Sequence, residues 1–180
     1  MKTLDLIRQL EWLDLQGRYL VSRKQLRTLF PGESSAAFTK AIQRACQEGI
    51  LESLTPGIYL NPRAHSYDGH LLEWLARLLR SGPRVYTYIS LESALSRYGL
   101  ISQMPVDRLT LMTTGRRGEI KTPYGVVEFT HTRRKGKSLL DSMLPKAKDE
   151  VLPLATQQAA LRDLQHVGRN THLLLSEVEG

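Results

Sequence analysis

Cysteine is almost absent from the sequence. Cys46 is the single cysteine, so an internal disulfide and a zinc site built from paired cysteines are both excluded. Its apolar neighbours favour a small core residue over a reactive thiol. Long apolar runs are also missing, because Glu73 and Arg77 interrupt the stretch from 71 to 79. Since no signal peptide opens the chain, we expect a cytoplasmic protein without a membrane contact.

Acidic residues are in deficit. The chain has 25 Lys and Arg against 18 Asp and Glu, which gives a net charge of +7 and an isoelectric point near 9.7. This surplus favours a polyanionic partner, and nucleic acid is the first to consider. The spacing of the histidines is not that of metal ligands, so we expect neither a metal nor another cofactor. They are His65, His70, His131, His166 and His172.

Residues with the arrangement needed for catalysis are scarce as well. The segment 115–118, Gly-Arg-Arg-Gly, lacks the Gly-Lys-Ser/Thr ending and the following helix of a phosphate loop, which favours a solvated turn. Ser90 and Ser93 stand where a helix is predicted to begin, and helix capping accounts for both. We therefore expect that the protein is not an enzyme.

Length and composition fit two domains. A chain of 180 residues with 41% hydrophobic content can bury two modest cores. The polar stretch 61–69 contains Pro and Gly, and no periodic apolar pattern crosses it. We therefore expect one domain over residues 1–68 and a second over residues 69–180.

The first domain has the element order of a winged helix-turn-helix. An amphipathic helix is predicted over residues 4–13, and a second helix runs from its N-cap Ser22 to Phe30. A Pro-Gly turn then leads to a third helix, which Gly49 ends. The hairpin predicted over residues 50–60 stands where a wing belongs.

The third helix has one apolar and one polar side. Its predicted buried side is formed by Ala37, Phe38, Ala41, Ile42 and Ala45. Side chains able to donate hydrogen bonds to base edges or phosphates lie opposite: Ser35, Thr39, Lys40, Gln43, Arg44 and Gln47. That profile is typical of a recognition helix in a DNA major groove. The alternatives are a solvated face without a partner and a winged helix that binds protein.

The second domain is predicted to be mixed α/β (α+β). Its expected helices cover residues 70–80, 90–98 and 156–166. Segments rich in β-branched and aromatic residues, separated by Gly and Pro turns, predict strands. The expected strands cover residues 85–89, 108–114, 119–122, 126–132 and 151–154.

A basic cluster lies in this domain. Between residues 115 and 137 the sequence has two acids and seven cations, which are Arg116, Arg117, Lys121, Arg133, Arg134, Lys135 and Lys137. A charge run is usually a solvated loop. The rival hypothesis is a nucleic-acid contact, either with DNA beside the bases that the third helix reads or with RNA, because phosphate contacts supply affinity without sequence information.

Several segments resemble the AbiEi family of bacterial antitoxins and regulators. Residues 88–101, Tyr-Ile-Ser-Leu-Glu-Ser-Ala-Leu-Ser-Arg-Tyr-Gly-Leu-Ile, are similar to the signature segment of that family. The Phe30-Pro31 turn looks like its helix-turn-helix. Three further segments look like its strand region: residues 113–116, 122–125 and 128–131. One departure is that Gln157 and Gln158 stand where the family usually has Pro and Glu.

The resemblance implies a DNA-binding autorepressor that is also the antitoxin of a type IV toxin–antitoxin pair. Its operator DNA would be inverted repeats upstream of its own operon, and its functional partner a nucleotidyltransferase-like toxin to which it does not bind stably. A second hypothesis comes from another class: an interaction module whose winged helix binds protein and whose basic strands bind RNA. Salt-sensitive binding to an upstream inverted repeat would separate the two.

Overall fold

The chain is a mixed α/β protein that divides into two compact units. The computed structural model describes residues 1–80, 82–101 and 107–174. Unit 1 comprises residues 1–71 and unit 2 residues 72–180, a division close to the boundary expected from the sequence. Within the described ranges, no helix has the length and apolar character needed to cross a bilayer.

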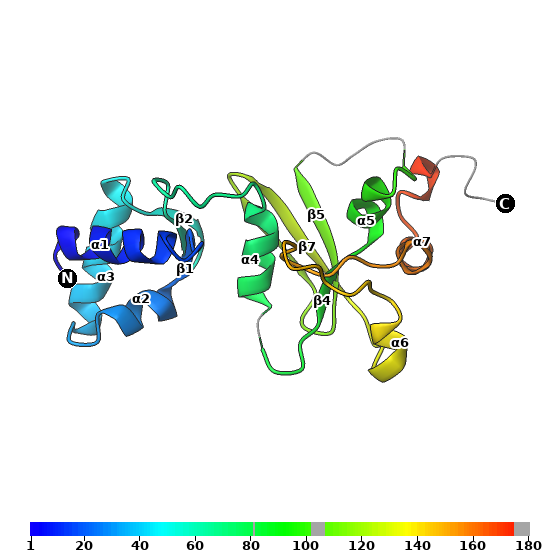
Figure 1. Ribbon diagram of the computed structural model, residues 1–180, viewed down its shortest axis with the longest axis horizontal. Coiled ribbons are helices and arrows are strands. Elements are labelled where there is room, and N and C mark those ends of the chain that lie inside the picture. The colour runs from blue at the N-terminus through cyan, green and yellow to red at the C-terminus, as the bar shows by residue number, and fades with distance from the viewer. Residues whose placement is uncertain (81, 102–106, 175–180) are drawn as a thin grey trace. The chain divides into compact units, whose positions relative to one another are not determined.

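Unit 1 combines helices with a small antiparallel sheet (Figure 1). In chain order its elements are α1 (Thr3–Asp14), β1 (Leu20–Ser22), α2 (Arg23–Leu29), α3 (Ser35–Gln47), β2 (Glu52–Thr55) and β3 (Ile58–Leu60). The central strand β3 pairs with both β1 and β2. The sequence did not predict β1, because three residues are too few to show an alternation of period two.

Helical spacing explains how the core of unit 1 forms. Leu6, Leu10 and Leu13 recur every three or four residues along α1, and all three side chains are buried. They belong to one apolar cluster with Phe38 and Ile42 of α3. This cluster fixes which side of α3 faces inward, and therefore which side faces solvent.

The segment after β3 is fastened to unit 1. The carboxylate of Asp14, at the end of α1, accepts hydrogen bonds from the backbone N–H groups of His65 at 2.8 Å and Ser66 at 2.9 Å. The Tyr19 hydroxyl donates a hydrogen bond to Asp68 at 2.6 Å. The polar stretch that marked the domain boundary is therefore an ordered part of unit 1.

Asp14 should make the stability of unit 1 depend on pH in the acid range. Burial raises the pKa of its carboxyl, but the hydrogen bonds from Ser66 and His65 lower it by more, so the pKa lies below its ordinary value of 3.8. A carboxyl with a depressed pKa contributes stability above about pH 4, and that contribution is lost as the pH falls through the folded-state pKa. Urea unfolding of the wild type and of Asp14→Asn should differ near neutral pH, and the difference should shrink in acid. A difference that stays constant with pH would contradict this assignment.

Unit 2 is built around a four-stranded sheet (Figure 1). Its described elements are α4 (Leu71–Leu79), β4 (Thr87–Ile89), α5 (Leu91–Arg97), β5 (Arg108–Thr113), β6 (Gly118–Thr122), β7 (Gly125–His131), α6 (Gly136–Leu140), α7 (Gln157–Val167) and the short helix η1 (Thr171–Leu173). The strand order is β4-β5-β7-β6, in which β5 and β7 are parallel and the other pairs antiparallel. Figure 1 shows α4 on one side of this sheet and α5 and α7 on the other.

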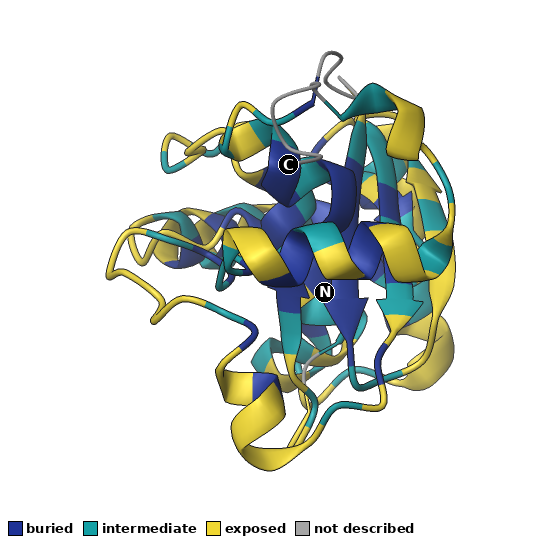
Figure 2. Cartoon of the chain, turned by 90° about the vertical axis from the view of Figure 1, so that its right-hand side faces the viewer, coloured by how far each residue is buried: buried dark blue, intermediate teal, exposed yellow. Residues whose placement is uncertain are grey.

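Burial follows this layering. In Figure 2 the helices are buried along one side and exposed along the other. Tyr88 and Ile89 of β4, Leu111 of β5, Val127 of β7 and Leu164 of α7 are fully buried. Leu75 of α4 and Leu95 of α5 are buried as completely, so the sheet and its helices build the core of unit 2 together.

Gly125, the first residue of β7, has a backbone that only glycine adopts here. Its φ is +129°, and a Cβ atom at this position would lie 2.7 Å from the carbonyl oxygen of Asp107 and 3.2 Å from the side chain of Leu72. The Asp107 oxygen belongs to the backbone just before β5 and cannot move aside cheaply. The absence of a side chain is therefore what allows β7 to begin beside β5.

One strand expected in unit 2 is absent, and one helix was not predicted. Residues 151–154 do not form a strand, and an isolated bridge joins Leu154 to Ile89 instead. The physical reason is Pro153, which has no N–H group to extend a ladder. Helix α6 was not predicted, because it directly follows a charge run that resembles a loop. The helix expected over residues 156–166 is confirmed as α7, with Thr156 as its N-cap.

Candidate nucleic-acid interface

Helix α3 exposes one long polar face. The helix begins after Ser34, whose side chain accepts a hydrogen bond from the backbone N–H of Ala37 at 3.2 Å. Its buried side consists of Phe38, Ala41, Ile42 and Ala45. Ala37, which the sequence placed on that side, is exposed, because it lies in the first turn before the first core contact at Phe38. The first turn of α3 therefore presents only small side chains to solvent.

Five of the six predicted contact side chains on α3 are exposed: Ser35, Lys40, Gln43, Arg44 and Gln47. Thr39 differs, because its hydroxyl donates to the carbonyl of Ser35 at 2.8 Å and accepts from Arg23 at 2.7 Å. Arg44 lies 3.9 Å from Glu48 in an exposed i,i+4 ion pair. Such a pair is weak in water, so the Arg44 guanidinium stays accessible.

Two arginines of α2, Arg23 and Arg27, lie beside this face, and they were not among the contact residues expected from the sequence. Each guanidinium carbon is 5.3 Å from the centroid of the Phe38 ring. A capping box fixes the start of α2. The Ser22 side chain accepts a hydrogen bond from the backbone N–H of Gln25, and the Gln25 side chain accepts one from the backbone N–H of Ser22. The i,i+4 spacing of the two arginines, which places them on one side of the helix, was the available signal.

The hairpin of β2 and β3 carries no positive charge. Residues 50–61 contain neither Lys nor Arg. Its turn is held against α2, because the Arg23 N–H donates to the carbonyl of Gly57 at 2.7 Å. The hairpin therefore supplies no cation to the polar face of α3, in contrast to α2, which supplies Arg23 and Arg27.

The seven cations of the basic cluster differ in their surroundings. Arg134 forms an ion pair with buried Asp163 at 2.5 Å and donates to the Tyr88 hydroxyl at 3.2 Å. Burial lowers the pKa of Arg134, but Asp163 and Tyr88 raise it by more. Lys121 lies 3.6 Å from Glu119. The remaining cations are exposed and have no acidic partner in the described part of the chain: Arg116, Arg117, Arg133, Lys135 and Lys137.

An open groove of about 1630 Å³ lies on unit 2, which we call the basic groove. The ends of β5 and β7, the turn before β6 and helix α7 line it. Its basic lining residues are Arg116, Arg117, His131, Arg133, Arg134, Arg162 and His166. Arg162 and His166 come from α7 and were not in the predicted cluster. Three members of that cluster, Lys121, Lys135 and Lys137, do not line the groove.

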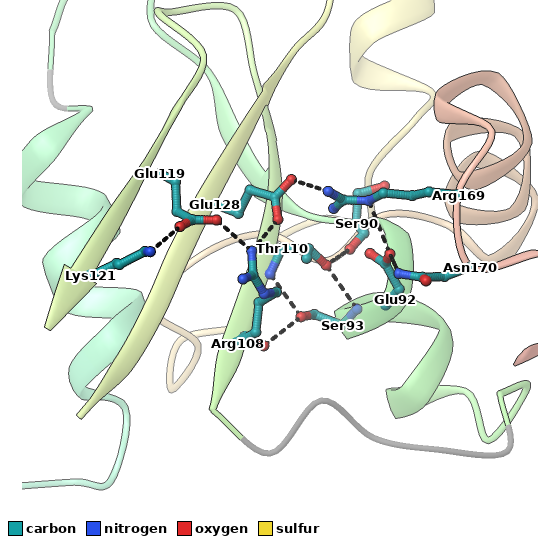
Figure 3. Close-up of polar contacts among 10 residues, drawn as sticks. All are labelled: Ser90, Glu92, Ser93, Arg108, Thr110, Glu119, Lys121, Glu128, Arg169 and Asn170. Carbon is teal, nitrogen blue, oxygen red and sulfur yellow. Dashed lines mark hydrogen bonds and ion pairs between the residues drawn. The ribbon is translucent and has the colours of Figure 1, made fainter. Parts of the chain in front are cut away.

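The acids that line the basic groove are paired with cations. They are Glu119, Glu128 and Asp163. Arg108 lies 2.8 Å from Glu119 and 2.6 Å from Glu128, and Arg169 lies 2.5 Å from Glu128 (Figure 3). The hydrogen bond from Arg108 holds the pKa of Glu119 below its ordinary value. Because these acids have cations of their own, they do not offset the charge of the other groove arginines.

Ser90 and Ser93 do not cap α5 with their side chains, which corrects the expectation from the sequence. The buried Ser90 hydroxyl donates to Asp163 at 2.8 Å. The Ser93 hydroxyl accepts from the N–H of Thr110 at 2.8 Å and so fastens α5 to β5 (Figure 3). In the ranges that the structure describes, no group of three or more His, Cys, Asp or Glu side chains is placed to hold a metal ion.

Comparison with known proteins gives a likeness of fold. No protein-family model matches this chain, and no curated protein matches it. Among solved structures, the RV2827C protein from Mycobacterium tuberculosis superposes over 89% of this chain with a TM-score of 0.53 and 17% sequence identity. The match spans 60% of the length of that protein. At this identity, the likeness shows that the two chains share a fold.

Proposed function

We propose that unit 1 is a winged helix-turn-helix that binds DNA, with α3 in the major groove and the β2–β3 hairpin as its wing. The observation that carries this proposal is the exposed polar face of α3, on which Lys40, Gln43 and Arg44 point away from the core. Arg23 and Arg27 add positive charge beside that face for contacts with phosphates. The small side chains of the first turn let the helix approach the DNA closely.

We infer further that the protein is a cytoplasmic autorepressor and antitoxin of a bacterial type IV toxin–antitoxin pair, like the AbiEi proteins that it resembles. In this proposal it has no catalytic activity, represses its own operon at inverted repeats, and counters a nucleotidyltransferase-like toxin without binding it stably. Residues 88–101, which resemble the signature segment of the family, supply most of β4 and all of α5 in unit 2. We therefore assign the antitoxin activity to unit 2 and the operator recognition to unit 1.

Repression and protection should separate in one full-length variant. Lys40→Ala/Arg44→Ala should release a reporter driven by the promoter of the operon, because it removes two exposed cations from α3. The same variant should still restore growth when it is expressed together with the toxin. The matched control is Lys2→Ala/Arg18→Ala, which removes one Lys and one Arg that are exposed outside α2 and α3. Unchanged repression would contradict the role of α3, and loss of both activities in a folded variant would contradict the assignment of units.

A further inference from the structure

Uncompensated positive charge is concentrated in the basic groove. Arg116, Arg117, Arg133 and Arg162 all line it, and none has an acidic partner in the described part of the chain. Arg162 donates a hydrogen bond to the hydroxyl of Ser142, at 3.3 Å, which leaves its charge unneutralised. Four guanidinium groups facing one open hollow attract anions and favour a ligand that carries several negative charges.

A fifth arginine, Arg80, lies beneath the turn that carries Arg116. Its guanidinium carbon is 4.2 Å from the centroid of the Phe129 ring, and its Nε donates to the Arg116 carbonyl at 3.0 Å. Burial lowers the pKa of Arg80, and the charge of Arg116 lowers it further. The two guanidinium groups therefore repel each other without an acid between them among the described residues. A bound anion would relieve this repulsion.

The residues that line the groove also indicate which part of a ligand the groove contacts. Among its residues, Phe129 is the sole Phe, Tyr or Trp, and this residue is buried, with the Arg80 guanidinium over its ring. The groove therefore offers no exposed Phe, Tyr or Trp side chain for stacking on an unpaired base, and its other rings are the imidazoles of His131 and His166. The groove is also larger and more open than the sites of about 300–1,000 Å³ that enclose small molecules. A strong positive charge with so little aromatic surface fits a phosphate backbone whose bases are already paired.

We propose that the basic groove binds the phosphodiester backbone of a nucleic-acid duplex without reading its sequence, through Arg116, Arg117 and Arg162. Arg134 is not part of this contact, because its guanidinium is paired with Asp163. The site lies within unit 2 and does not depend on whether α3 reads an operator. DNA and RNA duplexes present the same backbone chemistry, and the experiment distinguishes these two sources.

The test compares two triple variants of the full chain, both made in the Lys40→Ala/Arg44→Ala background so that α3 contributes little. The groove variant is Arg116→Ala/Arg117→Ala/Arg162→Ala. The matched control is Lys135→Ala/Lys137→Ala/Lys148→Ala, which removes the same charge from exposed residues that do not line the groove. Fluorescence anisotropy measures binding to short DNA and RNA duplexes of arbitrary sequence, and to their separate single strands, over a range of salt concentrations. Circular dichroism and thermal melting establish that each variant is folded.

The groove variant should bind at least one duplex about tenfold or more weakly at low salt. Its plot of log K against log salt should be shallower by about 0.9 for each phosphate that the protein no longer neutralises. The control should retain the affinity and slope of its background. An effect confined to DNA would make the groove an extension of DNA binding, and one confined to RNA would identify RNA as its ligand.

Three results would overturn this proposal. Equal reductions in affinity for the two triple variants would mean that net charge alone causes binding. Tighter binding of single strands than of duplexes would mean that unpaired bases are the ligand. If the Lys40→Ala/Arg44→Ala background variant bound neither duplex, the groove would have no ligand. Operator binding that is retained in this background is a different result: it would contradict the role of α3 and leave the groove proposal intact.

Discussion

Replacing Gln43 and Arg44 together with alanine should strongly weaken sequence-specific binding to the operator. A side chain that makes a good bidentate contact with a base contributes about 1–3 kcal/mol of discrimination, so removing two such side chains should reduce affinity at least tenfold. Both side chains are exposed and make no core contact, so the fold should be unchanged. Gel shifts with the promoter fragment, in the presence of competitor DNA, measure the effect.

The matched control for this prediction is Gln16→Ala/Arg18→Ala. It removes the same two residue types from exposed positions between α1 and β1, outside the proposed interface. Its operator affinity should equal that of the wild type. If the Gln43/Arg44 variant also bound like the wild type, α3 would not lie in the major groove.

Replacing Asp163 with alanine should destabilise unit 2 by about 3–5 kcal/mol, because it breaks a buried ion pair and leaves one partner without a counter-charge. The Arg134 side chain is 20% exposed and would lose its acid, and the buried Ser90 hydroxyl would lose its acceptor. Urea unfolding followed by circular dichroism measures this decrease in stability.

The neighbouring substitution Arg162→Ala serves as the control, because Arg162 makes no ion pair in the described part of the chain and its removal should change stability by less than about 0.5 kcal/mol. Adding Arg134→Met to Asp163→Ala should restore part of the stability, since the unpaired charge is then gone as well. An Asp163→Ala protein as stable as Arg162→Ala would show that the ion pair contributes nothing measurable.

Local patterns were sufficient to predict most of the helices and strands. The Leu6, Leu10 and Leu13 spacing gives α1, and the alternation in residues 126–132 gives β7, because each pattern is contained within one element. The same reasoning located the polar face of α3, and it failed at Ala37, where the end of the helix rather than its periodicity decides exposure.

Contacts between distant parts of the chain were beyond sequence reasoning. Ser90 does occupy the N-cap position of α5, but Asp163, more than seventy residues later, accepts its hydroxyl hydrogen bond. A capping rule considers only residues close in sequence, so it cannot predict a partner this distant. The energetic advantage of satisfying a buried carboxylate outweighs that of a cap, which is worth about 1 kcal/mol.

The candidate sites show the same limit. A run of cations in the sequence suggested one cluster, whereas the fold pairs Arg134 with an acid and leaves Lys135 and Lys137 outside the basic groove. The fold also adds Arg162 of α7 to the basic groove. In unit 1 the fold places Arg23 of α2 beside α3. Each missed residue lies on a different element from the motif that it joins.

Gly125 and the polar face of α3 differ in how freely they can evolve. A side chain at Gly125 would collide with the backbone at Asp107, so mutation to any other amino acid disrupts the start of β7. Lys40, Gln43 and Arg44 carry no part of the core and accept substitution without loss of the fold. Descendants of this chain can therefore acquire a new α3 sequence in few mutational steps, while their unit 2 sheet must keep the glycine that begins β7.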